Sequence, residues 1–124
     1  MPIDDLYATI GEAPITRLVA SFYSQIAADD ILGPMYPADD LRGAEQRLRD
    51  FLIGRFGGPQ HYIEQRGHPR LRMRHAEFQI DQRARDRWIE LMTNALDECA
   101  FPAEARETVL DFFRTMATFM INAH

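Results

Sequence analysis

Three of the four histidines recur at intervals of seven residues in the middle of the chain, and histidine clusters are candidates for metal sites. They are His61, His68 and His75. Gly67 and Pro69 lie between them and would interrupt a helix, so the three imidazoles are not expected on one helical face. The metal-binding motifs HExxH, CxxC with a downstream histidine pair and DxDxDG are absent from the sequence. A zinc hydrolase that uses the three histidines is therefore a weakly supported alternative.

His75 differs from the other two histidines because its neighbours in the sequence are apolar. Leu71, Met73 and Phe78 would surround an imidazole with a dry environment. A neutral imidazole is a good ligand for iron, and one protein histidine is enough to hold haem iron if an acceptor orients its other ring nitrogen. A histidine that only forms structural hydrogen bonds is the commoner interpretation, so the pattern alone leaves both roles open.

Four arginines crowd the same segment although the chain carries a formal net charge of -5. They are Arg66, Arg70, Arg72 and Arg74. A guanidinium group binds a carboxylate or phosphate through two hydrogen bonds, so the segment can receive an anionic ligand such as the propionates of haem. Three alternatives stay open: a solvated loop, a phosphate or nucleic-acid contact, and a haem-free helical interaction domain in which segment 66–74 docks an acidic partner.

Three of the aromatic residues that can donate hydrogen bonds are candidates for a shared pocket because of their places in the pattern. Tyr23 and Trp88 lie on apolar stripes, and Tyr36 lies at a corner before Pro37. A buried hydroxyl or indole N–H needs a partner, so each residue is interpreted individually as a core aromatic with a local hydrogen bond. Together, the three can also point their donors into one polar pocket.

The hydrophobic pattern predicts the helices that carry these residues. Apolar residues recur at steps of three and four in four long runs, from Ile15 to Ile26, Leu41 to Leu52, Trp88 to Cys99 and Val109 to Met120. Residues suited to begin these helices precede the runs, namely Pro14, Asp39 or Asp40, Asp81 and Pro102. The last stripe comprises Val109, Phe112, Phe113, Met116, Phe119 and Met120. A short helical turn is expected at 31–36 and a loop with one short helix at 60–78, which indicates an all-α domain.

Length and composition restrict the class of protein. With 124 residues, 46% hydrophobic and 27% charged, the chain suits a single globular domain over residues 1–124. No uncharged stretch is long enough to cross a bilayer, and acids follow Met1 where a secretory signal would carry basic residues, so a cytoplasmic location away from the membrane is expected. The net charge disfavours general binding to nucleic acid. The single cysteine, Cys99, excludes an internal disulfide.

Short motifs along nearly the whole chain form a recognisable set. They are Leu6-Tyr7, Ile10-Gly11, Phe22-Tyr23, Met35-Tyr36-Pro37, Asp39-Asp40-Leu41, Gly57-Gly58-Pro59, the block from Gln65 to His75, and Arg87-Trp88. The block from Arg66 to His75 is the most specific of them. Through these motifs the sequence resembles the truncated haemoglobins of the second group. Relatives often have an aromatic pair before the Gly-Gly-Pro motif, where this chain has Arg55-Phe56, so the wall of the pocket can differ there.

The resemblance implies a two-over-two helical sandwich around haem b. It makes His75 the proximal ligand of the iron and builds the opposite, distal side from Tyr23, Tyr36 and Trp88. Ala44 takes the position where many globins keep a distal histidine. The residues implied to contact haem, besides His75, are Arg47, Leu48, Phe51, Leu52, Tyr62, His68, Leu71, Arg72 and Arg74, with Arg47 and the arginines of segment 66–74 on the propionates.

The resemblance also implies a function. Donors on the distal side would stabilise a diatomic ligand that gains partial negative charge, and slow oxygen release would follow. The expected ligands are oxygen, nitric oxide, carbon monoxide, cyanide and sulfide. Nitric oxide dioxygenase and peroxidase-like activities are chemically open, which would require an unidentified reductase. A homodimer is also compatible with the sequence.

Overall fold

The computed structural model describes residues 1–123, and these residues form helices joined by short connections, with no strand among them. Four long helices dominate: α2 (Glu12–Ile26), α3 (Leu41–Arg55), α6 (Gln82–Glu98) and α7 (Ala103–Phe119). The short elements are η1 (Ile3–Asp5), α1 (Leu6–Ile10), η2 (Gly33–Met35), α4 (His61–Arg66) and α5 (Leu71–Arg74). The prediction of an all-α fold is confirmed. Within the described part of the chain, no helix has the length and apolar character needed to cross a membrane.

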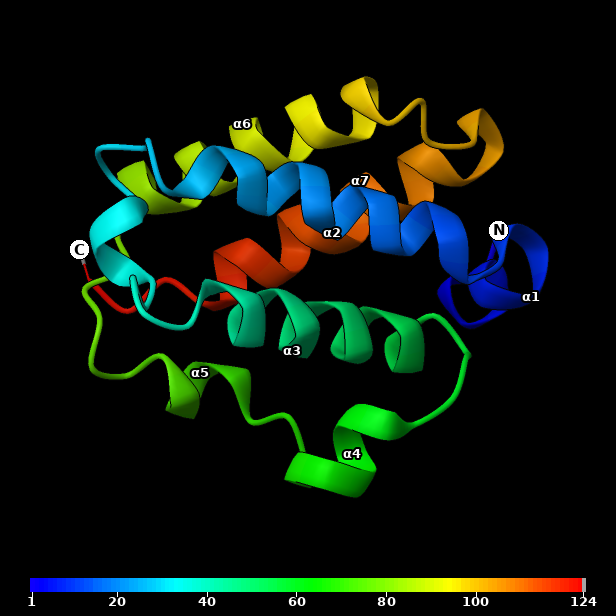
Figure 1. The fold of residues 1–124 in the computed structure, drawn as a ribbon, viewed down its shortest axis with the longest axis horizontal. Helices are drawn as coiled ribbons and strands as arrows, with labels where there is room; N and C mark the ends of the chain where they lie inside the picture. The colour runs from blue at the N-terminus through cyan, green and yellow to red at the C-terminus, as the bar shows by residue number, and fades with distance from the viewer. Residues whose placement is uncertain (124) are drawn as a thin grey trace.

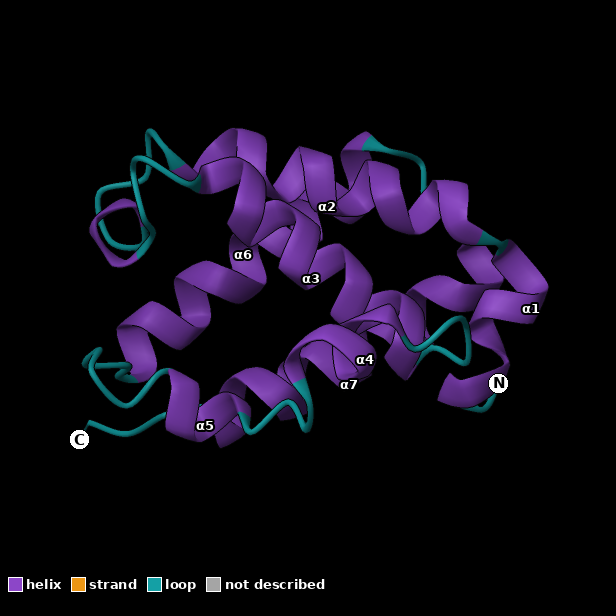
Figure 2. Ribbon diagram, turned by 60° about the horizontal axis from the view of Figure 1, so that its bottom comes forward, coloured by secondary structure: helices purple, strands orange, loops and turns teal. Residues whose placement is uncertain are grey.

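The long helices form two packed pairs, α2 with α3 and α6 with α7. The two pairs meet where α2 packs against α6. In Figure 1, α3 runs beside α2, and the short helices α4 and α5 follow on the outer side of α3. Figure 2 shows that α5 lies beside the C-terminal end of the chain. The segment between α3 and α6 therefore borders the helical sandwich instead of joining its core.

The apolar stripes and caps explain why these helices form where they do. All six predicted stripe residues of α2 are buried: Ile15, Leu18, Val19, Phe22, Tyr23 and Ile26. The Asp40 carboxylate accepts a hydrogen bond from the backbone N–H of Gly43 at the start of α3, and the Asp81 carboxylate accepts one from Ala84 at the start of α6. Each cap satisfies a backbone N–H that has no partner within its helix. Of the two aspartates proposed to begin α3, Asp40 is the cap.

Two expectations about helices were wrong. The stripe predicted for α7 included Phe119, but its side chain is 60% exposed. The buried face of α7 instead repeats every four residues through Ala105, Val109, Phe113 and Ala117, and Phe119, two residues beyond Ala117, points away from that face. Residues 60–78 contain two short helices instead of one, since four residues of α5 are too few to show a period.

The turn after α3 requires glycine. Gly57 has φ +97, a backbone conformation that L side chains rarely adopt, and a Cβ atom there would collide with the backbone oxygen of Asp4. The backbone N–H of Tyr7 donates to the carbonyl of Phe56 at 2.9 Å. The end of α3 is thereby fixed against the N-terminal helices, and the chain leaves α3 in the direction of α4.

Candidate functional site

A large cavity of about 730 Å³ lies among α2, α3, α6, α7 and the segment that carries α4 and α5. Its volume is in the range of small-molecule and cofactor sites, and its wall is mostly apolar. The cavity brings together most residues that the sequence predicts for the site: Tyr23, Tyr36, Arg47, Leu48, Phe51, Leu52, Tyr62, Leu71, Arg74, His75 and Trp88. His68 and Arg72 do not line it.

His75 follows α5, and its ring is oriented by the backbone of that helix. The Nδ1 atom lies 2.7 Å from the carbonyl oxygen of Leu71. Because a carbonyl can only accept, Nδ1 must carry the proton, and the lone pair of a neutral imidazole is then on Nε2. His75 lines the cavity, and a neutral His75 with this Nδ1 contact would offer Nε2 to a metal.

The arginines beside His75 have internal roles that the sequence did not predict. Arg74 donates from Nε to the carbonyl of Pro69 at 2.8 Å and from Nη2 to the carbonyl of Arg66 at 2.9 Å. The guanidinium groups of Arg66 and Arg74 lie 5.9 and 6.0 Å from the centre of the Tyr62 ring. These contacts hold the chain between α4 and α5 in place, where Arg70 has a left-handed backbone conformation with φ 43.

The end of the chain supports the same segment. The side chain of Asn122 accepts from the backbone N–H of Ile80 at 2.8 Å and donates to the carbonyl of His75 at 3.4 Å. Arg72 donates from Nη2 to the carbonyl of Ile121 at 3.3 Å. The backbone that carries His75 is therefore held from the C-terminal side by residues distant in sequence, a relationship that no local pattern could predict.

The three predicted donors come from three different elements and meet in the cavity wall. The rings of Tyr23 and Tyr36 lie 5.6 Å apart, and the Trp88 ring packs between those of Phe22 and Phe113, each 5.2 Å away. Burial raises the pKa of Tyr23 far above its usual range, and Tyr36 adds to this. Burial likewise raises the pKa of Tyr36 to about 12, against the opposing effect of a hydrogen bond from Trp88. Both phenols keep their protons at neutral pH and can donate them in hydrogen bonds.

The charged residues of the cavity wall are mainly basic. They are Arg47, Arg66, Arg74 and Arg85, against Glu77. This local excess of positive charge occurs in a chain whose net charge is -5. A ligand that is largely apolar but carries carboxylates would find apolar contacts inside and cations at the edge.

Two of these arginines are fixed in different ways. Arg47 forms a partly exposed ion pair with Asp40 at 3.3 Å. Arg85 donates to the hydroxyl of Thr118 at 3.2 Å and to the carbonyl of Arg114 at 3.3 Å, which ties it to α7. Arg85 was not predicted as a site residue, and neither were the cavity-lining methionines Met35, Met116 and Met120.

The donor set fits haem and does not fit a metal held by protein side chains alone. Haem needs one histidine with a free lone pair, an apolar cleft and cations for its propionates, and all three are present in this cavity. In residues 1–123, no group of three or more His, Cys, Asp or Glu side chains is placed to hold a metal ion. The three histidines at seven-residue spacing are therefore not gathered into a zinc site.

Comparisons with known proteins identify the family of this chain. The sequence matches the bacterial-like globin family over residues 5–122. It is 35% identical to the group 2 truncated haemoglobin YjbI of Bacillus subtilis over 116 residues, which cover 94% of this chain and 87% of that protein. Among solved structures, the haemoglobin of the thermophilic phototrophic bacterium Chloroflexus aurantiacus is 46% identical, with a TM-score of 0.90 and coverage of 98% of this chain and 99% of that one. The thermostable haemoglobin of the actinobacterium Thermobifida fusca is 45% identical, with a TM-score of 0.88 and 98% coverage of both chains. The chain thus belongs to the truncated haemoglobins of the second group, and its cofactor is haem.

Proposed function

We propose that this truncated haemoglobin binds oxygen tightly and releases it slowly, with His75 as the proximal ligand and Tyr23, Tyr36 and Trp88 as distal donors. One observation carries the proposal: His75, whose Nδ1 atom lies against the Leu71 carbonyl, and the three donors Tyr23, Tyr36 and Trp88 line the same mostly apolar cavity. Haem supplies an iron to which oxygen, nitric oxide, carbon monoxide, cyanide and sulfide bind.

The distal donors act on the charge of the ligand. A diatomic ligand that gains partial negative charge is stabilised by O–H and N–H groups aimed at it, and such bonds are stronger in a dry cavity than in water. The small side chain of Ala44 leaves space beside the ligand, and the apolar Leu48 keeps water away from it. A relative supports the expectation of tight binding: a truncated haemoglobin from Bacillus subtilis, 35% identical with a TM-score of 0.88, is described as oxygen-avid.

The remaining wall residues hold the cofactor. Phe51, Leu52 and Leu71 offer apolar surface to its ring system, and Arg47 offers its guanidinium to a propionate. Arg74 uses two of its five N–H groups on backbone carbonyls and can give others to a propionate. The Tyr62 ring lies against the guanidinium groups of Arg66 and Arg74 and so supports this contact.

Two residues predicted for cofactor contact are left out of this proposal. The ring of His68 accepts at Nδ1 from the backbone N–H of Arg70 at 3.3 Å, and Arg72 donates to Ile121. Both side chains are engaged outside the cavity wall. The haem-free interaction domain is not favoured, because two of the four arginines proposed to dock an acidic partner, Arg72 and Arg74, are bonded to backbone carbonyls of the protein, and the chain belongs to a haem-binding family.

A slowly releasing site suits redox chemistry or sensing better than bulk oxygen delivery. The proposal therefore extends to nitric oxide dioxygenase or peroxidase-like turnover, with a separate reductase as electron donor. Homodimer formation is compatible with this function and is tested by the mass of the haem-loaded protein in solution.

The function is tested by the rate of oxygen release from the haem-loaded protein. Trp88→Phe and Tyr36→Phe should each speed release by roughly fivefold or more, the effect of losing one hydrogen bond. Tyr7→Phe is the matched control, since Tyr7 does not line the cavity in the described structure. Release at the wild-type rate in both Trp88→Phe and Tyr36→Phe would remove the distal donors from the function.

A further inference from the structure

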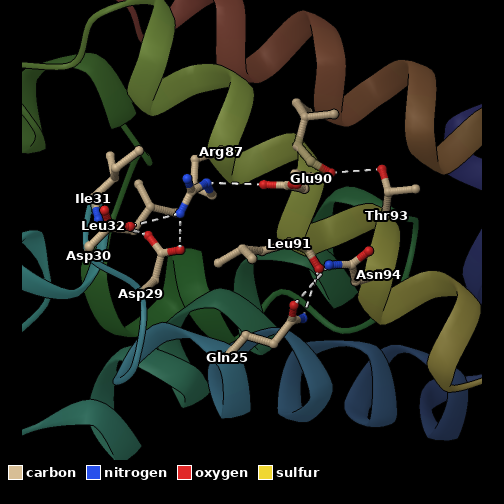
Figure 3. Close-up of polar contacts among 11 residues, drawn as sticks. Gln25, Asp29, Asp30, Ile31, Leu32, Arg87, Glu90, Leu91, Thr93 and Asn94 are labelled. Carbon is tan, nitrogen blue, oxygen red and sulfur yellow. Dashed lines mark hydrogen bonds and ion pairs between the residues drawn. The ribbon is translucent and has the colours of Figure 1, made fainter.

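An ion pair whose carboxylate is largely shielded from solvent and whose guanidinium is partly exposed joins the corner after α2 to the second turn of α6 (Figure 3). Nη1 of Arg87 lies 2.6 Å from Oδ1 of Asp29 and 3.0 Å from Oδ1 of Asp30, and Nε lies 3.0 Å from Oε2 of Glu90. The Asp29 side chain is 6% exposed, against 74% for Asp30 and 62% for Glu90. Exposed ion pairs have little structural effect, so the contact with Asp29 is the one that can hold the two elements together.

The second carboxylate oxygen of Asp29 organises the corner that leads to Tyr36. Its Oδ2 atom accepts hydrogen bonds from the backbone N–H groups of Ile31 at 3.1 Å and Leu32 at 2.8 Å. The Asp29 carbonyl accepts from the N–H of Gly33 at 3.0 Å, and the N–H of Tyr36 donates to the carbonyl of Gly33 at 3.2 Å. The segment from Asp29 to Tyr36 is therefore one hydrogen-bonded unit, and its position depends on the carboxylate.

Arg87, the basic partner in the ion pair, directly precedes Trp88 in α6. One turn further along α6, the side chain of Gln25 donates to the carbonyl of Leu91 at 2.9 Å and accepts from the side chain of Asn94 at 3.3 Å (Figure 3). α6 is thus held to the end of α2 at two successive points. The contact between Arg87 and Asp29 is the one that joins the residue before Trp88 to the segment that leads to Tyr36.

We propose that the Asp29–Arg87 ion pair positions the Tyr36 hydroxyl and the Trp88 indole relative to each other. The two donors lie on separate elements, and hydrogen bonds to a small ligand require their placement to within about half an ångström. Neither Asp29 nor Arg87 lines the cavity, so both are positioning residues. This inference rests on the proposed function, because it concerns the donors that face the ligand.

The test compares two variants at this contact with two controls at the same guanidinium. Asp29→Asn keeps an oxygen that can accept from the corner but removes the charge, and Arg87→Met removes the pair from the other side. Asp30→Asn and Glu90→Gln remove the exposed partners of Arg87. The haem-loaded proteins are studied with carbon monoxide as the probe.

Two spectroscopic readouts report on the donors directly. The infrared stretching band of bound carbon monoxide responds to nearby hydrogen-bond donors. The indole N–H band in the ultraviolet resonance Raman spectrum belongs to Trp88 alone, because the sequence contains one tryptophan. A general loss of stability moves neither band, so both separate positioning from folding.

Asp29→Asn and Arg87→Met are expected to shift or split both bands and to speed oxygen release roughly fivefold. The double variant is expected to show no larger change than either single variant, because both remove the same interaction. If Asp29→Asn does not fold, Arg87→Met decides the question. Bands and rates that match those of the two control variants would overturn the positioning role.

Trp88→Phe, measured alongside, keeps this inference separate from the proposed function. If Trp88→Phe changes the carbon monoxide band and oxygen release while the ion-pair variants change neither, only the positioning role fails. If oxygen release is unchanged in Trp88→Phe and Tyr36→Phe, the proposed function fails.

Discussion

Asn122 and His75 lie 47 positions apart in the chain and are joined directly, because the side-chain amide of Asn122 donates to the carbonyl of His75 at 3.4 Å. The same side chain accepts from the backbone N–H of Ile80, and the backbone N–H of Asn122 donates to the Ile80 carbonyl at 2.9 Å. The C-terminal residues thus hold the backbone on which the proposed proximal ligand is carried.

Asn122→Ala is predicted to speed the loss of haem. Removal of the side chain breaks the bonds to His75 and Ile80, and about 1 to 1.5 kcal/mol of lost hydrogen bonding corresponds to a roughly five- to tenfold faster loss. The measurement is the transfer of haem to an excess of a haem-free globin acceptor. Asn94→Ala removes an exposed contact with Gln25 away from the cavity wall, so it is the control and should lose haem at the wild-type rate. Equal rates in both variants would show that Asn122 does not support the proximal side.

Ser21→Ala is predicted to leave stability unchanged or to raise it by up to about 1 kcal/mol. The Ser21 hydroxyl oxygen is buried and has no hydrogen-bond partner within residues 1–123, so alanine removes an unmet polar group. Alanine also has a higher helix propensity. The check is urea unfolding, with Ser24→Ala as the comparison at an exposed hydroxyl. A loss greater than about 1 kcal/mol in Ser21→Ala would mean that this hydroxyl has a partner after all.

Asp29 is predicted to make stability depend on pH in the acid range. Burial alone would raise the pKa of its carboxyl, but the N–H of Leu32, the guanidinium of Arg87 and the N–H of Ile31 outweigh burial and hold the pKa below its usual 3.8. The folded-state pKa is thus below the unfolded one. Asp29 therefore contributes stability that is fully present above the unfolded pKa and is lost as the pH falls through the folded pKa.

The free energy of unfolding by urea measures this contribution. At pH 7 wild type should be more stable than Asp29→Asn, and the difference should shrink between about pH 4 and pH 2. Asp30→Asn, at an exposed carboxylate on the same arginine, should match wild type more closely at both ends of this range. A difference between wild type and Asp29→Asn that stays constant with pH would contradict the depressed pKa.

Elements with a long apolar period could be predicted from the sequence, and of the short ones the helical turn expected at 31–36 is confirmed by η2. The stripe from Ile15 to Ile26 is buried as expected. The stripe predicted from Trp88 to Cys99 is buried in its middle, from Leu91 to Leu96, and partly buried at Trp88 and Cys99, and Asp81 caps α6. The N-terminal elements and α5 have three to five residues each, too few for a repeat to show. The prediction for Phe119 was wrong because it rested on a step of three from Met116, whereas the buried face of α7 repeats every four residues.

The cavity wall could be predicted from motifs, but the contacts that support it could not. His75, Tyr23 and Trp88 were found because the motifs around them resemble a known family, and all three line the cavity. The Asp29–Arg87 pair spans 58 positions and the Asn122–His75 contact 47, so neither leaves a local pattern in the sequence. Such contacts depend on the packed fold.

The role of His75 is tested most directly by the ultraviolet and visible spectra of the haem-reconstituted protein in its ferric, reduced and carbon monoxide forms. His75→Ala is compared with wild type and with His68→Ala, whose ring lies outside the cavity wall in the described structure. Wild type and His68→Ala are expected to show a strong Soret band that shifts with carbon monoxide. His75→Ala is expected to lose this band after gel filtration and to regain it when imidazole is added. A His75→Ala protein that keeps the wild-type spectra without imidazole, or a wild-type protein with no Soret band, would contradict this role.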